Sequence, residues 1–194
     1  MNTVDTYPSR SPTEICWEEI AYDDHSVQIY ADSQSFLDAL EGFASGGLRI
    51  GESVIVIATE PHRRALERKL SRRGFNLEQA ALDNRYIAVD AAVTLNQFMV
   101  DGHVDSEKFN DCVMDLFTRA SGNGRRVRAF GEMVALLWKQ GDHASTIELE
   151  SLWNEFSSRV GLCLFCAYPR SAFTDAHQDS LHTICAHHSR IIPE

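Results

Sequence analysis

The chain has 194 residues, 44% of them hydrophobic and 24% charged, which suits one domain with a substantial core and excludes a wholly disordered or fibrous protein. Asp and Glu number 28 against 18 Lys and Arg, so the formal net charge is -10. This balance argues against direct binding to nucleic acid or to anionic membranes, because both require clustered cations. Apolar runs such as residues 54–58 and 162–168 are far shorter than the ~20 residues of a membrane-spanning helix.

Residues 1–16 are polar, contain two prolines and lack the basic-then-apolar pattern of a secretory signal. We expect a flexible N-terminal arm over residues 1–16, followed by a single domain over residues 17–194. The five cysteines are an odd number in a long chain, which does not indicate a disulfide framework. The sequence therefore predicts a cytoplasmic protein with reduced thiols.

From residue 17 onward, short β-branched runs alternate with helical patterns, which is typical of an α/β fold with a mainly parallel sheet. The expected strands are residues 26–30, 53–58, 86–90, 127–130 and 161–168. The expected helices are an apolar stripe over 36–44 that stops at Gly46-Gly47, a helix begun by Pro61, and helices over 109–120, 142–160 and 177–190. This order predicts about five or more strands flanked by helices in three layers.

Polar residues follow several predicted strands, and parallel strands all end at one edge of their sheet, where ligands bind. The residues that this argument brings together include Tyr30, Asp32, Glu60, His62, Asp90, Glu132 and Tyr168. Their carboxylates could bind a cation, accept hydrogen bonds from a ligand or act as general bases. The alternative is helix capping, since Asp32, Glu60 and Glu132 each suit the start of a helix.

Common catalytic motifs are missing: no lysine stands in a phosphate-binding loop, and there is no Gly-x-Ser-x-Gly or His-Glu-x-x-His. Cys163 and Cys166 have metal-ligand spacing, but positions three apart on a strand point to opposite faces, so core packing is favoured. His182, Cys185 and His188 at three-residue intervals are a weak metal candidate on a helix, the alternative being an exposed histidine surface.

Several segments together resemble the MEDS family, the methanogen/methylotroph DcmR-type sensory domain. They are DHSVQIY at 24–30, GESVIVIAT at 51–59, YIAVD at 86–90, RAFGEM at 128–133, LW at 137–138, ESLWNE at 150–155, CAYP at 166–169 and CAHHSR at 185–190. The resemblance implies a non-catalytic input domain that senses small organic compounds, with a RecA/KaiC-like fold that has lost its phosphate-binding loop. The matching residues with chemistry to offer are His25, Gln28, Tyr30, Asp90, Glu132, Trp138, Trp153 and Tyr168. Asp32 departs from the family, which commonly carries two or three acids there.

The leading hypothesis is therefore a sensory domain that binds a small organic ligand at the carboxyl edge of the sheet. Residues 17–194 leave no room for an output domain, so we expect signalling to a separate protein such as a kinase or transcription regulator. Exposed helix faces would permit a homodimer. One alternative is a nucleotide-binding or enzymatic domain that uses Glu60, Asp90 and Glu132, and another is a pure protein-interaction module. No cofactor follows from the sequence, and the resemblance leaves nucleotide binding without hydrolysis open.

Overall fold

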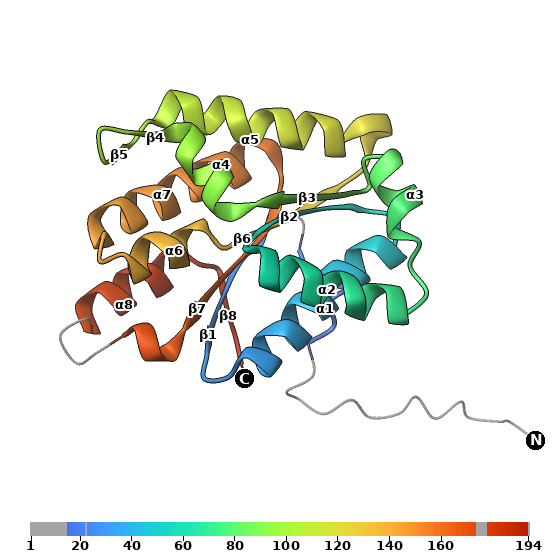
Figure 1. The fold of residues 1–194 in the computed structure, drawn as a ribbon, viewed down its shortest axis with the longest axis horizontal. Coiled ribbons are helices and arrows are strands. Elements are labelled where there is room, and N and C mark those ends of the chain that lie inside the picture. Colours follow the sequence, from blue (N-terminus) through green and yellow to red (C-terminus); the bar gives the residue numbers. More distant parts are fainter. Residues whose placement is uncertain (1–14, 22, 174–177, 194) are drawn as a thin grey trace, which may run out of the picture.

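The computed structural model describes residues 15–21, 23–173 and 178–193. Its centre is a sheet of six parallel strands in the order β3-β2-β6-β7-β1-β8 (Figure 1). These strands are β1 (His25–Tyr30), β2 (Ser53–Ala58), β3 (Tyr86–Asp90), β6 (Val127–Gly131), β7 (Cys163–Pro169) and β8 (Arg190–Ile192). The parallel sheet expected from the sequence is confirmed, and five of its strands lie within two residues of their predicted bounds.

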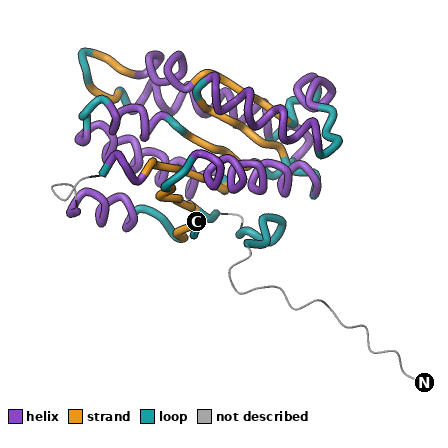
Figure 2. Tube along the Cα trace, turned by 60° about the horizontal axis from the view of Figure 1, so that its bottom comes forward, coloured by secondary structure: helices purple, strands orange, loops and turns teal. Residues whose placement is uncertain are grey.

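Helices cover both faces of this sheet and complete a three-layer α/β architecture (Figures 1 and 2). One face is covered by α1 (Ser33–Arg49), α2 (Glu60–Arg72) and α3 (Leu77–Leu82). The other is covered by α4 (Ala91–Phe98), α5 (Ser106–Ala120), α6 (Met133–Lys139), α7 (His143–Val160) and α8 (Gln178–Ala186). Short 3-10 turns, η1 (Gly122–Gly124) and η2 (Arg170–Ala172), precede β6 and follow β7. The strands therefore hold two separate apolar cores, one on each side.

The predicted helix over 177–190 is wrong at its end, because the chain leaves α8 at Ala186 and forms β8. The amide of His188 donates to the carbonyl of Cys185 and closes the last turn of the helix. The amide of Ser189 then donates to the carbonyl of His25, which sets β8 beside β1. Pairing with β1 thus supplies the hydrogen bonds that a continued helix would have made within itself.

The predicted helix stop at Gly46-Gly47 is also wrong, since α1 continues to Arg49. Both glycines are buried inside the helix. A Cβ atom at position 46 would lie 2.9 Å from Cβ of Trp17, and one at position 47 would lie 2.8 Å from Cδ of Arg128. The two glycines therefore permit close packing rather than ending the helix.

A small hairpin that the sequence analysis did not predict joins β4 (Met99–Val100) to β5 (His103–Val104) on the α4 and α5 side of the molecule (Figure 1). Its two turn residues, Asp101 and Gly102, have φ angles of 51° and 82°. An Asp-Gly pair with positive φ at both positions is a strong hairpin signal.

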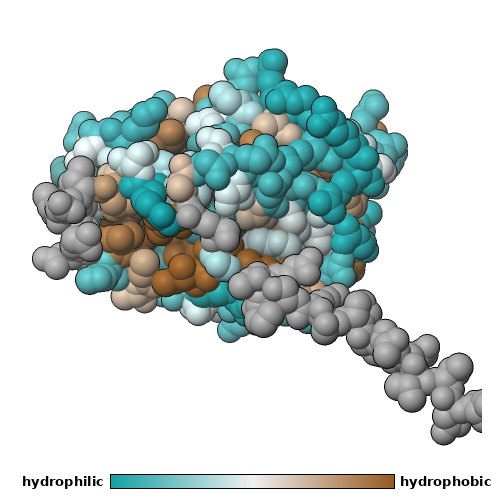
Figure 3. All heavy atoms as spheres, turned by 90° about the horizontal axis from the view of Figure 1, so that it is seen from below, coloured by the Kyte–Doolittle hydropathy of each residue, from teal (hydrophilic) through white to brown (hydrophobic). Residues whose placement is uncertain are grey.

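The surface seen from below is largely hydrophilic, with a hydrophobic area at the lower left of the view (Figure 3). Among the described residues, no helix is long and apolar enough to cross a membrane. Most of the arm predicted over residues 1–16, namely residues 1–14, lies outside the described residues.

Candidate functional site

The carboxyl edge of the sheet carries a group of contacts around Glu132, which follows β6 and is only 8% exposed. Oε2 of Glu132 accepts hydrogen bonds from the amide of Thr59, at 2.7 Å, and from its hydroxyl, at 3.1 Å. Oε1 lies 2.8 Å from Nδ1 of His62. Glu132 precedes α6 without capping it, so its carboxylate instead fixes the turn between β2 and α2.

Aromatic rings adjoin this carboxylate. Tyr30, at the end of β1, stacks on Phe36 with ring centroids 4.8 Å apart, and Phe36 meets the ring of His62 edge-on at 4.9 Å. Burial, with a smaller contribution from the negative charge of Glu132, raises the pKa of Tyr30 to about 12. The structure thus brings Tyr30, His62 and Glu132 together, as the strand-end argument expected.

Asp90 lies at the end of β3 and contacts a different set of groups. Its Oδ1 accepts hydrogen bonds from the amides of Ala92 and Val93 and caps α4, while Oδ2 lies 3.1 Å from Nη2 of Arg63. The pKa of Asp90 is lowered, chiefly by the Val93 amide. Asp90 also lines an open hollow of about 490 Å³ bounded by α2, β3, α4 and α5.

Asp32 and Glu60 have the local roles of the capping alternative. Oδ1 of Asp32 accepts hydrogen bonds from the amides of Gln34, at 2.7 Å, and Ser35, at 3.0 Å, and so caps α1. Glu60 is in the first turn of α2 and forms an exposed ion pair with Arg64. The acids of the enzymatic alternative, Glu60, Asp90 and Glu132, each bind different partners.

Gln28 and Trp138 are buried away from these groups. The side-chain amide of Gln28 donates to the carbonyl of Pro193 at 3.4 Å, beside β8. The indole of Trp138 donates to the carbonyl of Ala172 at 2.8 Å and stacks on His143. Trp153 is buried in the core on the α7 side of the sheet.

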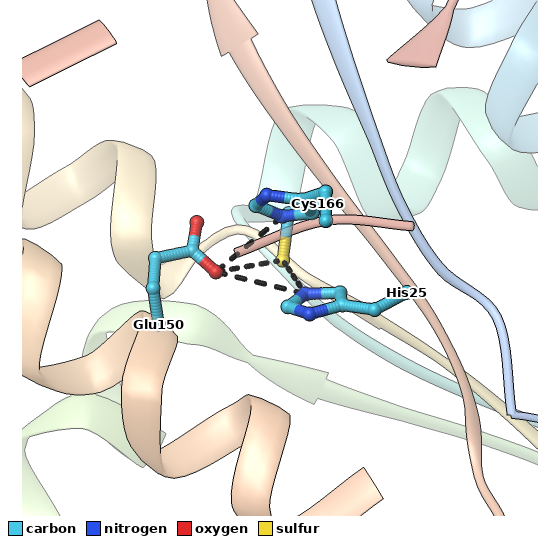
Figure 4. A group of neighbouring side chains, drawn as sticks. His25, Glu150 and Cys166 are labelled. Carbon is cyan, nitrogen blue, oxygen red and sulfur yellow. Dashed lines mark hydrogen bonds and ion pairs between the residues drawn. The ribbon is translucent and has the colours of Figure 1, made fainter. Parts of the chain in front are cut away.

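His25 and Tyr168 belong to a second assembly, which lies between the sheet and the helices α7 and α8. It is centred on four side chains that we call the buried quartet: His25, Glu150, Cys166 and His188. The first three come from the start of β1, the middle of α7 and the middle of β7 (Figure 4). His188 comes from the segment between α8 and β8. One potential ligand atom from each residue lies within 4.8 Å of all the others.

The contacts within the buried quartet converge on Oε2 of Glu150. This atom lies 3.6 Å from Nε2 of His25 and 3.7 Å from Sγ of Cys166 (Figure 4). It also lies 3.5 Å from Nε2 of His188. Sγ of Cys166 also lies 3.6 Å from Nε2 of His25. The other carboxylate oxygen of Glu150 accepts a hydrogen bond from the hydroxyl of Tyr168.

Burial disfavours every charged form in this assembly. It raises the pKa of Glu150 to about 7 and lowers the pKa of His25 to about 3 and of His188 to about 4. It also raises the pKa of the Cys166 thiol well above its ordinary value. Among the described residues, the side chains of the buried quartet lie close enough together to hold a metal ion.

The sequence analysis named His25 only among the residues that match the family, and it grouped His188 with His182 and Cys185. The structure places His188 after the end of α8 and brings it instead to His25, with ring centroids 4.0 Å apart. Cys163 and Cys166 do point to opposite faces, since they lie in different cores. One feature of the sequence could have indicated the quartet. Glu150 lies beside the apolar stripe of its helix, where a carboxylate becomes buried.

These features define an α/β domain of the kind that places polar residues at the carboxyl ends of parallel strands. A model of the MEDS family, the MEthanogen/methylotroph, DcmR Sensory domain, matches residues 24–188. This match covers most of the chain, which therefore belongs to the MEDS family of sensory domains. No curated protein sequence matches the chain significantly.

Proposed function

We propose that this sensory domain is a non-catalytic input module that binds a small organic ligand in the hollow beside β3. The main observation in support of this proposal is that Asp90 and Arg63, at the carboxyl edge of the sheet, line a cavity of about 490 Å³. This volume is in the range of pockets that hold small molecules.

The lining of the hollow indicates the chemistry of its ligand. Val89 and Leu116 supply apolar surface, while two opposite-charge pairs, Arg63 with Asp90 and Arg119 with Asp115, supply polar groups. A molecule with a short apolar body and one charged end would cover the apolar surface and exchange one of these ion pairs for its own. Both pairs are partly exposed, so the exchange costs little.

The helices that line the hollow suggest how ligand binding could affect the contact with another protein. α4 and α5 both contribute residues to it and pack against each other through Phe98 and Phe109, whose rings meet edge-on at 5.4 Å. A ligand wedged between these helices would change the surface that they form. We expect a separate signalling protein to bind that surface.

A second hollow, of about 640 Å³, is lined by Trp17, Gln28 and residues of α1. Residues 15–18 and Pro193 border it, and the neighbouring positions 1–14 and 194 lie outside the described residues. The hollow beside β3 is bounded wholly by described elements and contains Asp90, so it supports the proposal better.

The test is calorimetry of the full chain with short-chain carboxylates and short-chain amines, in the unmodified protein and in two variants. Val93→Trp places a large ring in the hollow, whereas Leu82→Trp changes a similarly exposed apolar residue on α3, outside it. We expect one-to-one binding of at least one probe by the unmodified chain and by Leu82→Trp, and its loss in Val93→Trp. Absence of binding by every probe, or equal binding by both variants, would reject this ligand site.

A further inference from the structure

The buried quartet has polar atoms that its own hydrogen bonds do not satisfy. The side chains of Glu150 and His188 are 0% exposed, and that of His25 is 3% exposed. Nε2 of His188 has no hydrogen-bond partner among the described residues, although it faces Oε2 of Glu150 at 3.5 Å. An unsatisfied polar atom in such a place is costly, which calls for a group that it can bind.

The orientation of His188 shows which kind of group would fit. Nδ1 of His188 lies 2.7 Å from the carbonyl oxygen of Ile184, an acceptor, so Nδ1 carries the proton and Nε2 presents its lone pair. This lone pair points toward a carboxylate oxygen, which also offers lone pairs. Two electron donors that face each other at this distance are complementary to a cation placed between them.

The distances agree with those around a tetrahedral zinc ion. Zinc bonds of about 2.3 Å to sulfur and about 2.0–2.2 Å to nitrogen or oxygen give tetrahedron edges of about 3.3–3.6 Å. Four edges of the quartet, from sulfur to nitrogen, sulfur to oxygen and each imidazole nitrogen to oxygen, measure 3.6, 3.7, 3.6 and 3.5 Å. The remaining two pairs of ligand atoms lie within 4.8 Å of each other, so the four side chains surround a common point and would draw closer together around one ion.

The donor types restrict the choice of ion. A thiolate and two imidazoles do not suit Ca²⁺ or Mg²⁺, which prefer oxygen ligands, but they are ordinary ligands of zinc. Two positive charges on the ion would also compensate the charge of Glu150 and that of a Cys166 thiol that loses its proton to the metal. Among the described residues, the ion-pair contacts of Glu150 are with His25 and His188.

Outer contacts hold the ligands in place, as they do at established zinc sites. The Tyr168 hydroxyl holds Oε1 of Glu150, and the Ile184 carbonyl holds the ring of His188. Such contacts fix the orientation and the protonation state of a ligand before the metal arrives.

From this geometry we propose that the buried quartet is a closed, four-ligand zinc site. Four protein ligands leave no position for a substrate, which indicates a structural or regulatory ion rather than a catalytic one. His188 lies between α8 and β8, so the ion would fasten the C-terminal segment to β1, β7 and α7. Zinc occupancy would thereby control how firmly residues 178–193 dock on the sheet.

The test uses the full chain, stripped with a chelator and titrated with Zn²⁺ or with Co²⁺ as a spectroscopic probe. We expect one ion per chain and, with Co²⁺, the charge-transfer absorption of a thiolate ligand. Cys166→Ser should abolish this absorption and weaken binding by at least ~100-fold, which is more than the loss of an outer contact costs. Cys163→Ser, on the opposite face of β7, and Cys185→Ser, in the weak motif with His182, should bind as the unmodified chain does.

Circular dichroism of every variant shows whether it is folded. His188→Ala is the second variant, because it alters a residue between elements and leaves the sheet unchanged. If Cys166→Ser does not fold, loss of binding in folded His188→Ala supports the proposal and retained binding overturns it. The proposal also fails if the unmodified chain binds no stoichiometric ion, or if thiolate absorption disappears in Cys185→Ser instead. Hydrogen exchange should slow across residues 178–193 when zinc is added, and unchanged exchange there would overturn the docking role.

Discussion

Gly47 of α1 lies in direct contact with the side chain of Arg128 of β6, such that a Cβ atom at position 47 would come within 2.9 Å of Nε. Arg128 is 1% exposed, and its guanidinium binds Glu52 and the carbonyl of Trp17. Its Cζ lies 5.6 Å from the centroid of the Phe43 ring. The absence of a side chain at position 47 thus makes room for a buried cation that links α1 to the sheet.

Gly47→Ala should therefore destabilise the fold even though alanine favours helix by about 1 kcal/mol. Overpacking against a fixed side chain costs about 1–3 kcal/mol, and we expect a net loss near 1 kcal/mol in urea-induced unfolding. Gly122→Ala is the control, because its nearest neighbour would be Nη2 of Arg125 at 3.5 Å, an ordinary contact. A more stable Gly47→Ala protein would contradict this account of the contact.

Arg128→Met should cost about 3–5 kcal/mol, because it leaves the carboxylate of Glu52 buried without its principal partner. Glu52 is 6% exposed, and its other partner, Nε of Arg126, is 3.3 Å away. The double variant Glu52→Gln, Arg128→Met should lose less stability than the sum of the single changes, by about 1–3 kcal/mol. A double-mutant cycle in urea measures this coupling, and strict additivity would show that the pair does not interact.

The loss of stability at acid pH should depend in part on the ionisation of Asp90. Its pKa is lowered in the folded protein by the Val93 amide and by Arg63, so the folded state favours the ionised carboxylate more than the unfolded chain does. The resulting stability is complete above the unfolded pKa of about 3.9 and is lost as the pH falls through the lower folded value. Asp90→Asn keeps a capping side chain but removes the charge.

For Asp90→Asn we expect stability within about 1 kcal/mol of the unmodified protein at neutral pH, with a weaker decline below pH ~4. Asp90→Ala, which also removes the cap, should lose about 1 kcal/mol at neutral pH. Urea unfolding at a series of pH values measures both effects. Identical acid profiles for Asp90→Asn and the unmodified protein would refute the role of this carboxylate.

Tyr168→Phe tests the outer contact of the proposed zinc site. The change removes the hydroxyl that donates to Oε1 of Glu150 and leaves all four quartet side chains in place. Zinc affinity should fall by about 10–100-fold, as it does when such outer contacts are lost elsewhere. Competition with a coloured chelator measures the change, and Tyr30→Phe, at the carboxyl edge of the sheet, serves as the matched control. Equal affinities of the two variants would show that the Tyr168 hydroxyl does not position Glu150.

Local patterns were sufficient for most of the secondary structure. The runs at 53–58 and 86–90 give β2 and β3 with the predicted bounds, because β-branched residues in a short apolar run suit a buried parallel strand. The helix expected over 142–160 is α7, which begins at His143 and is capped by Asp142. Glycine at 46 and 47 misled the helix prediction, since their role depends on Trp17 and Arg128, which are distant in sequence.

Sequence alone determined the alternation of strands and helices and the family resemblance, because both depend on short stretches of neighbouring residues. Only the tertiary structure decided which polar side chains meet. Positions 25, 150, 166 and 188 share no local spacing, and they converge because β1 pairs with both β7 and β8 while α7 packs over them. The physical reason is that strand order and helix packing depend on how the whole chain buries its apolar surface, which no short segment specifies.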